Sequence, residues 1–285
     1  MVFLESIYSS RSGKKTYIAE YGLPARPHGL VILIHGLGEH IRRYDEQFHY
    51  FVNKGYACLA ADLPGHGRSE GRRGVWSSMD EPYAVIDRLF AIAAEKYPDT
   101  PRILYGHSMG ANIAARYMQV RQPALRAAIL TGIPIRTPKD MPRPLVRAIL
   151  SSPVWIKNLT IKNGLNIQSL CGDAQVVKNY LADPLVHDRV SLGAGASILD
   201  NAYHLTHTEW APSFPVLVMH GEDDKITFPE GSVLLKSVWN KNVDLKIWPG
   251  MMHEIHNEIL KKQVWDHMLS WLDLLNNQDT DNLSR

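Results

Sequence analysis

The sequence Gly106-His107-Ser108-Met109-Gly110 decides the fold of this chain. It matches the pattern G-x-S-x-G, in which a serine lies on a sharp turn between a strand and a helix. The flanking residues agree: Arg102–Tyr105 is typical of a short buried strand, and Met109–Arg121 is typical of a helix. Both glycines must lack a side chain, because Cβ atoms there would collide with the neighbouring strand and helix. We therefore interpret Ser108 as a nucleophile at the edge of a sheet, rather than as part of a turn that only reverses the chain.

Composition predicts a globular protein. The chain has 285 residues, 45% of them hydrophobic, which is enough to bury a large core. Its formal net charge of +2 gives no reason to expect a nucleic-acid partner.

The first residues lack the pattern of a signal peptide, and no apolar run reaches the about 18 residues of a membrane span. Cys58 and Cys171 suggest packed thiols rather than a disulfide framework. We expect a cytoplasmic location.

Strand and helix patterns alternate along most of the chain. A hairpin over Val2–Ser9 and Lys15–Glu20 opens it. Further strands are expected at 30–34, 56–61, 102–105, 127–130, 216–219 and 245–248, and helices at 41–54, 80–97, 109–121 and the C-terminal end. This alternation predicts an α/β fold with a mostly parallel sheet of about eight strands, flanked by helices on both faces.

Residues 132–214 interrupt this alternation. They separate two predicted sheet strands, whereas a crossover with its helix needs only about a dozen residues or somewhat more. Helical patterns occur near Pro142–Leu150, Ala174–Leu181 and Leu192–Leu205. Because ligands bind outside the carboxyl ends of the strands in open α/β sheets, we expect these helices to form a cap there. The predicted core is then 1–131 and 215–285, and the predicted helical cap, or lid, is 132–214.

A serine nucleophile needs a base to take its proton. The chain has 13 histidines, so position must choose among them. His253 lies in the loop between the last predicted strand and the last helix, where a loop at the carboxyl edge can bring an imidazole to Ser108. His256 is the competitor, and we expect it instead to cap the start of the helix.

The base in turn needs an orienting acid. It is expected after the strand 216–219, where Glu222, Asp223 and Asp224 are adjacent. We choose Asp224 because it is the last acid of the turn, and keep Asp223 as the alternative. The alternative interpretation of the acidic cluster is a solvent-exposed turn without a catalytic role, and we expect it to apply to Glu222 and Asp223.

Two backbone N–H groups should stabilise the developing oxyanion. One is expected from Met109, at the start of its helix, where amides are unpaired. The other is expected from Leu37, because Gly36 and Gly38 let the backbone approach the substrate closely. A glycine-rich loop could also bind phosphate, but this one matches neither G-x-G-x-x-G nor a Walker A motif. The histidines form no H-E-x-x-H motif and no close Cys/His cluster, so we predict no metal and no cofactor.

Four sequence blocks occur together along the chain. They are His35-Gly36-Leu37-Gly38-Glu39-His40 with Arg43-Tyr44, the segment Asp62-Leu63-Pro64-Gly65-His66-Gly67-Arg68-Ser69-Glu70-Gly71, the GHSMG turn, and Gly250, His253 and Glu258 in the order G-x-x-H-x-x-x-x-E. As a set they resemble the α/β-hydrolase superfamily, and more closely its monoacylglycerol lipase and lysophospholipase branch, of the serine aminopeptidase S33 type. The resemblance implies an α/β-hydrolase fold with Ser108, Asp224 and His253 as catalytic triad. It also implies Leu37 and Met109 as oxyanion donors.

The predicted function is a serine carboxylic-ester hydrolase that acts on single-chain lipid esters through an acyl-enzyme. A general carboxylesterase, an aminopeptidase-type amide hydrolase or a C–C bond hydrolase would use the same triad. A ligand-binding protein without activity would be expected to have lost a member of it.

The first part of the predicted cap is basic and apolar. The cations of the segment 126–163, which enters this cap, are Arg126, Arg136, Lys139, Arg143, Arg147, Lys157 and Lys162, interleaved with Leu145, Val146, Ile149, Leu150, Val154, Trp155 and Ile156. Such a segment suits a peripheral contact with a membrane surface. A cap helix that packs its apolar side over the active-site cleft would show the same pattern.

Overall fold

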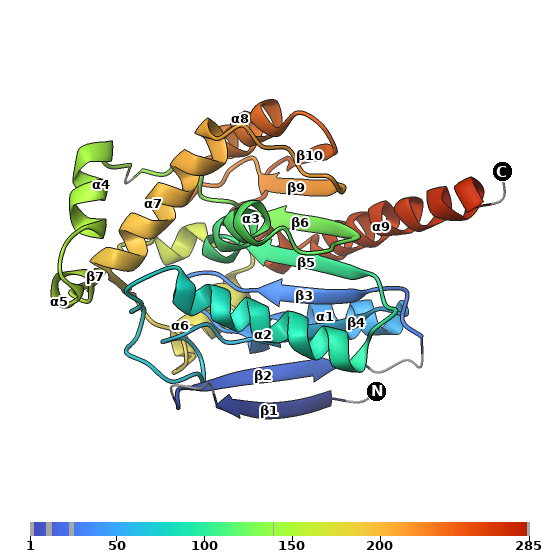
Figure 1. Cartoon of the computed structure of the whole chain (residues 1–285), viewed down its shortest axis with the longest axis horizontal. Helices are drawn as coiled ribbons and strands as arrows, with labels where there is room; N and C mark the ends of the chain where they lie inside the picture. Colours follow the sequence, from blue (N-terminus) through green and yellow to red (C-terminus); the bar gives the residue numbers. More distant parts are fainter. Residues whose placement is uncertain (1–2, 10–12, 23–25, 139, 284–285) are drawn as a thin grey trace.

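The computed structural model of the protein describes residues 3–9, 13–22, 26–138 and 140–283, with side chains up to residue 275. Val2, Arg11 and Ser12 of the predicted hairpin, and Lys139 of the basic segment, lie outside the described residues. The prediction of a mostly parallel sheet of about eight strands is confirmed (Figure 1).

The eight strands lie in the order β1-β2-β4-β3-β5-β6-β9-β10. Strand β2 is antiparallel to both β1 and β4, and the remaining pairs are parallel. The strands are β1 (Phe3–Ser9), β2 (Lys15–Tyr21), β3 (Leu30–Ile34), β4 (Ala57–Ala61), β5 (Arg102–His107), β6 (Ala127–Thr131), β9 (Val216–Gly221) and β10 (Val243–Trp248). The parallel strands end at one edge, so the loops that follow them meet there.

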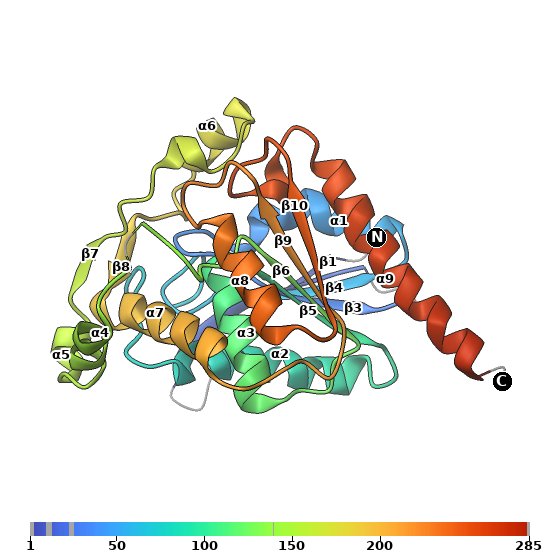
Figure 2. The ribbon, with the colours of Figure 1, turned by 90° about the horizontal axis from the view of Figure 1, so that it is seen from above.

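Helices cover both faces of the sheet because its central strands are apolar on both sides. Leu30, Ile32 and Ile34 of β3 join one core cluster, and Val31 and Leu33 join the other, since successive side chains of a strand point to opposite faces. Helices α2 (Asp80–Lys96), α3 (Met109–Arg121) and α8 (Pro229–Trp239) pack on the first face, and α1 (Asp45–Asn53) and α9 (Lys261–Leu283) on the second (Figures 1 and 2).

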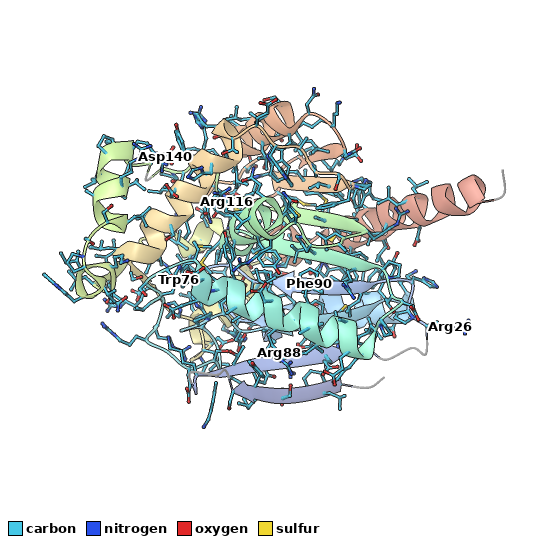
Figure 3. All side chains as sticks on the ribbon, viewed as in Figure 1. Arg26, Trp76, Arg88, Phe90, Arg116 and Asp140 are labelled. Atoms are coloured by element: carbon cyan, nitrogen blue, oxygen red, sulfur yellow. The ribbon has the colours of Figure 1, made fainter. Side chains whose placement is uncertain are left out.

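Aromatic contacts fix the helices of the first face to one another. Phe90 of α2, labelled in Figure 3, stacks on Tyr117 of α3 with ring centroids 5.9 Å apart. Trp76, which precedes α2, is fully buried, and its carbonyl oxygen accepts a hydrogen bond from the Ser191 hydroxyl at 3.3 Å.

The two cysteines of the chain, Cys58 and Cys171, are buried and form no disulfide.

The predicted helix 41–54 is split in two. Ile41–Tyr44 forms a 3-10 turn, η1, before α1 begins. The Ile41 N–H donates to the Asp62 carboxylate at 2.9 Å, and the Arg43 N–H reaches back to the His40 carbonyl oxygen. These bonds hold a tighter turn than an α-helix would allow.

We call residues 132–214, the predicted extent of the cap, the cap segment. In order along the chain it contains α4 (Arg143–Leu150), α5 (Val154–Lys157), β7 (Thr160–Lys162), η2 (Ile167–Ser169), α6 (Ala174–Ala182), β8 (Arg189–Ser191) and α7 (Leu192–His207). Figure 1 shows these elements beyond the carboxyl ends of the parallel strands. The antiparallel pair β7–β8 was not predicted, because each strand has only three residues.

The two ends of the cap segment differ in packing. Helix α7 lies against α3, and its Ala194, Ala202 and Leu205 belong to the main core cluster. By contrast, Leu145 of α4 and Trp155 of α5 are 49% and 68% exposed. The part made of α4, α5 and β7, which we call the outer cap, therefore presents apolar surface to solvent.

Candidate active site

The turn between β5 and α3 holds Ser108 in a strained conformation. Its φ of +52° and ψ of −125° lie in a region that side-chain-bearing residues rarely adopt. A Cβ atom on Gly106 would lie 2.6 Å from the Ala111 Cα, and one on Gly110 would lie 2.0 Å from the Ile34 carbonyl oxygen. Both positions therefore require glycine, because the helix on one side and strand β3 on the other leave no room. The strain persists because this packing imposes it.

Ser108, His253 and Asp224 lie in direct contact, although they come from three separate loops. His253 Nε2 lies 2.9 Å from the Ser108 Oγ, 145 residues away in the sequence. His253 Nδ1 lies 2.6 Å from the Asp224 Oδ2. His253 and Asp224 are each 3% exposed, whereas Ser108 is partly exposed. A proton on the serine oxygen thus has a direct path to a buried imidazole whose other nitrogen is held by a carboxylate.

Asp224 is fixed by the turn in which it lies. Its Oδ1 accepts hydrogen bonds from the N–H groups of Ile226 and Thr227 at 2.8 and 2.9 Å. Its Oδ2 accepts one from the Thr227 hydroxyl at 2.8 Å and one from His220 Nε2 at 2.9 Å. Glu222 and Asp223 are exposed, so neither carboxylate takes part in this set of contacts.

The charges of the site favour an ionised acid and a basic imidazole. Burial raises the pKa of Asp224, but attraction to His253 and the hydrogen bonds from His220 and His253 outweigh burial and hold it well below its usual range. Burial lowers the pKa of His253, but the Asp224 carboxylate outweighs burial and raises it above its ordinary value. Burial also lowers the pKa of His107, whose ring centroid is 5.0 Å from that of His253. Among the described residues, Asp224 is the carboxylate that contacts the His253 imidazole directly.

The expectation that His256 caps the last helix is wrong. His256 lies in the 3-10 turn η3 (Ile255–Asn257), and α9 begins only at Lys261. The His256 ring is buried and stacks on Tyr44, with centroids 4.7 Å apart and an interplanar angle of 9°. Packing against η1 holds this ring in the core, away from the helix terminus.

The loop after β3 lies against the nucleophile. A Cβ atom on Gly36 would be 3.2 Å from the Ser108 Cβ. The Gly36 N–H donates to Glu39 Oε1 at 2.6 Å, and the Gly38 carbonyl oxygen accepts from the His187 N–H of the cap segment at 2.9 Å. These two hydrogen bonds fix the backbone on both sides of Leu37, whose N–H is the predicted oxyanion donor. The Met109 N–H belongs to the first residue of α3, where no intrahelical acceptor exists.

A buried ion network lies behind this loop. Arg43 donates to both carboxylate oxygens of Glu254, each at 2.6 Å, and to Glu39 Oε2 at 2.5 Å. Attraction to Arg43 outweighs burial for Glu254, whose pKa is lowered to about 2, whereas burial prevails for Glu39, whose pKa is raised. Since Glu39 holds Gly36 and Glu254 follows His253, Arg43 joins the loop of the predicted oxyanion donor to the loop of the predicted base.

Three further histidines near the site, His35, His40 and His66, make contacts within and between loops. His35 Nε2 accepts from the Leu63 N–H at 2.9 Å, and His40 Nε2 contacts Asp183 Oδ2 of the cap segment at 2.8 Å. His66 Nδ1 lies 3.0 Å from the Pro64 carbonyl oxygen. Among the residues that the structure describes, no three His, Cys, Asp or Glu side chains form a group suited to hold a metal ion.

Three polar residues of the site were missed by sequence reasoning. His220 and Thr227 both contact Asp224, and Arg43 connects two loops. The acidic turn directly follows strand β9. His220, near the end of β9, and Thr227, just beyond the turn, flank it in the sequence, and this position could have indicated their contact with the acid. Nothing local indicates the contact between Arg43 and Glu254, which are 211 residues apart.

Within the described part of the chain, no helix is long and apolar enough to cross a lipid bilayer.

The sheet order and the serine turn define an α/β-hydrolase of the serine type. A family model described as serine aminopeptidase, S33, matches residues 25–259, and the chain belongs to this family.

Relatives of this chain include proteins named as lipases. The chain is 32% identical over 254 residues to a monoacylglycerol lipase of Mycolicibacterium smegmatis, which covers 86% of this chain and 88% of the relative. It is 34% identical over 258 residues to an uncharacterized abhydrolase domain-containing protein of Dictyostelium discoideum, covering 87% of this chain but 26% of that longer protein. The crystal structure of a monoacylglycerol lipase from Paleococcus ferrophilus superposes with a TM-score of 0.81 at 31% identity, covering 91% of this chain and 99% of that one.

Proposed function

We propose that this serine hydrolase cleaves single-chain lipid esters through an acyl-enzyme, with Ser108, His253 and Asp224 as its catalytic triad. The Ser108 oxygen attacks the ester carbonyl while its proton passes to His253 Nε2. The N–H groups of Leu37 and Met109 bind the oxygen that becomes negative. His253 then gives the proton to the departing alcohol. A water molecule, deprotonated by His253, releases the fatty acid and restores Ser108.

One observation carries the proposal. The contacts of 2.9 Å from His253 to Ser108 and 2.6 Å from His253 to Asp224 form a continuous chain of hydrogen bonds in the order that acyl transfer requires. Asp224 has the additional role of keeping the Nδ1 proton on His253, so that Nε2 faces the serine as an acceptor.

The choice of a lipid ester rests on the relatives and on the cap segment. The Mycolicibacterium and Paleococcus proteins are both named monoacylglycerol lipases. The apolar outer cap, close to the carboxyl edge of the sheet, suits a substrate that arrives from an apolar phase. The second candidate is an aminopeptidase-type amide hydrolase, which the family description favours and the same triad would serve.

We further propose that the enzyme works in the cytoplasm with a peripheral contact at a membrane surface. The outer cap exposes Leu145, Val154, Trp155 and Ile161, and Leu159 is exposed in the link between α5 and β7. Arg147 and Lys162 are exposed beside them and could meet anionic headgroups. Arg143 is less available, because it pairs with Asp200 and its guanidinium lies 3.9 Å from the centre of the Tyr203 ring.

Labelling and turnover test the catalytic proposal together. A fluorophosphonate probe should form an adduct with the protein that is absent in Ser108→Ala. Hydrolysis should then be measured on monoacylglycerols, lysophospholipids, short p-nitrophenyl esters and aminoacyl amides. We expect turnover of the long-chain esters. Turnover confined to the amides would replace the lipid proposal with the aminopeptidase, and a wild-type protein without adduct or turnover would contradict both.

A further inference from the structure

One oxygen of Asp224 serves two imidazoles. His253 Nδ1 lies 2.6 Å from Oδ2, and His220 Nε2 lies 2.9 Å from the same atom. His220 belongs to β9, four residues before Asp224, and is fully buried. The mechanism proposed above uses His253 and leaves the second imidazole without a role.

The surroundings of His220 determine which nitrogen carries a hydrogen. Nε2 also lies 2.8 Å from the Thr227 carbonyl oxygen, which can only accept a hydrogen bond. Nε2 must therefore carry a hydrogen, shared between the Thr227 carbonyl and the Asp224 carboxylate. On the other side of the ring, Nδ1 lies 2.7 Å from the Ser232 hydroxyl of α8. Helix α8 thus orients the imidazole through one nitrogen, and the other nitrogen donates to the acid.

We propose that His220 is a positioning residue that acts through Asp224, holding Oδ2 in place and sharing the negative charge that this oxygen presents to His253. The inference rests on the function proposed above. It gives Oδ2 a second imidazole donor besides His253, which keeps the carboxylate aligned with the base and weakens its hold on the base's proton.

Loss of the His220 donor should therefore strengthen the pull of Asp224 on His253. A carboxylate with one donor fewer stabilises the charged imidazolium more, so His253 would keep its proton to a higher pH. The ionisable groups that surround His253 are Asp224, His107, His256, Glu39 and Glu254, with Arg43 paired to both glutamates. Of these groups, Asp224 is the one that hydrogen-bonds to His220 among the described residues, and the Thr227 hydroxyl lies 3.2 Å from both imidazoles. The direct link from His220 to His253 therefore runs through Asp224 and the Thr227 turn that holds it.

The test compares pH profiles of kcat/KM for a p-nitrophenyl ester in the wild type, His220→Leu and His220→Gln. We expect the acidic limb of His220→Leu to move up by about half to one pH unit, with a plateau about tenfold lower. Glutamine can place an N–H near the lost Nε2, so His220→Gln should return the limb to the wild-type pH. The low-field proton resonance of the His253 Nδ1–H should move in His220→Leu and return in His220→Gln.

Ser232→Ala is the matched control, because it removes the outer contact of the same ring without touching Asp224. Its limb should stay at the wild-type pH. If His220→Leu does not fold, His220→Asn replaces it, since the shorter amide reaches toward Ser232 but not toward Asp224. A wild-type limb in the Leu or Asn variant overturns the inference. So does a limb that moves in His220→Gln or in Ser232→Ala as far as it moves in His220→Leu. A wild-type protein without turnover would instead contradict the proposed function itself.

Discussion

At the carboxyl edge of the sheet, the loops that carry Ser108, Asp224 and His253 hold buried polar groups in defined contacts, whereas the outer cap exposes apolar side chains. The Asp224 carboxylate alone accepts hydrogen bonds from four residues. Trp155, by contrast, is 68% exposed. Buried polar groups are costly unless partnered, so each change in the first region should affect chemistry or stability. Changes in the outer cap should affect only how the enzyme meets its substrate.

The largest expected effect is the loss of kcat when Asp224 is substituted, compared with substitution of its neighbour Asp223. Asp224→Asn should lower kcat about 10⁴-fold, because an amide cannot keep the proton on Nδ1 of His253 or stabilise the imidazolium. Asp223→Asn, one residue away and exposed, should leave kcat within about twofold. Steady-state hydrolysis of a soluble ester measures both. A strong loss in Asp223→Asn would reassign the acid.

The next effect is on stability. Arg43→Met should lower the free energy of unfolding by about 3 to 5 kcal/mol, because it leaves the Glu39 and Glu254 carboxylates buried without a cation. Arg147→Met, at an exposed position of α4, should change it by no more than about 0.5 kcal/mol. Urea unfolding followed by tryptophan fluorescence gives both values. Equal stabilities for the two variants would mean that the buried network contributes no more than an exposed side chain.

Activity should also depend on pH through His253. The proposed base would act as a neutral imidazole, so we expect kcat/KM to fall as the pH drops through the pKa of His253. Since Asp224 raises this pKa, the acidic midpoint should lie above the ordinary value of about 6.5. A profile of kcat/KM from pH 5 to 9 checks the direction. A midpoint below that value would mean that burial, rather than the carboxylate, controls the base.

The smallest effect concerns the outer cap. Trp155→Ser should weaken binding to anionic vesicles about fivefold, or ~1 kcal/mol, while kcat on a soluble ester stays unchanged. Val233→Ser is the control, because Val233 is 50% exposed on α8, outside the cap segment. Sedimentation with vesicles of anionic and zwitterionic lipid measures binding. If the two variants bind alike, the proposed membrane contact of the outer cap is wrong.

Much of the fold could be predicted because its signals are local. The strand periodicity and the glycines of the Ser108 turn follow from neighbouring residues. So does α9, in which the apolar residues Val264, Met268, Leu272 and Leu275 recur every three or four positions. Helix α3 has the predicted bounds. Helix 41–54 was predicted as a single element because the bond from Ile41 to Asp62 is not visible in its own sequence. The strands β7 and β8 are too short to carry a periodic pattern.

By itself, the sequence did not indicate α8, β7 or β8, but it determined the succession of the eight sheet strands along the chain and of most of the helices, the sharp turn at Ser108 and the loops from which a base and an acid would come. These follow from steric limits and hydrophobic periods that act over a few residues. Only the tertiary structure decided which groups meet: His220 and Thr227 at Asp224, Arg43 between Glu39 and Glu254, and α7 in the core while α4 and α5 stay exposed. Such contacts depend on how distant segments pack, and no local pattern encodes the partner of a buried charge.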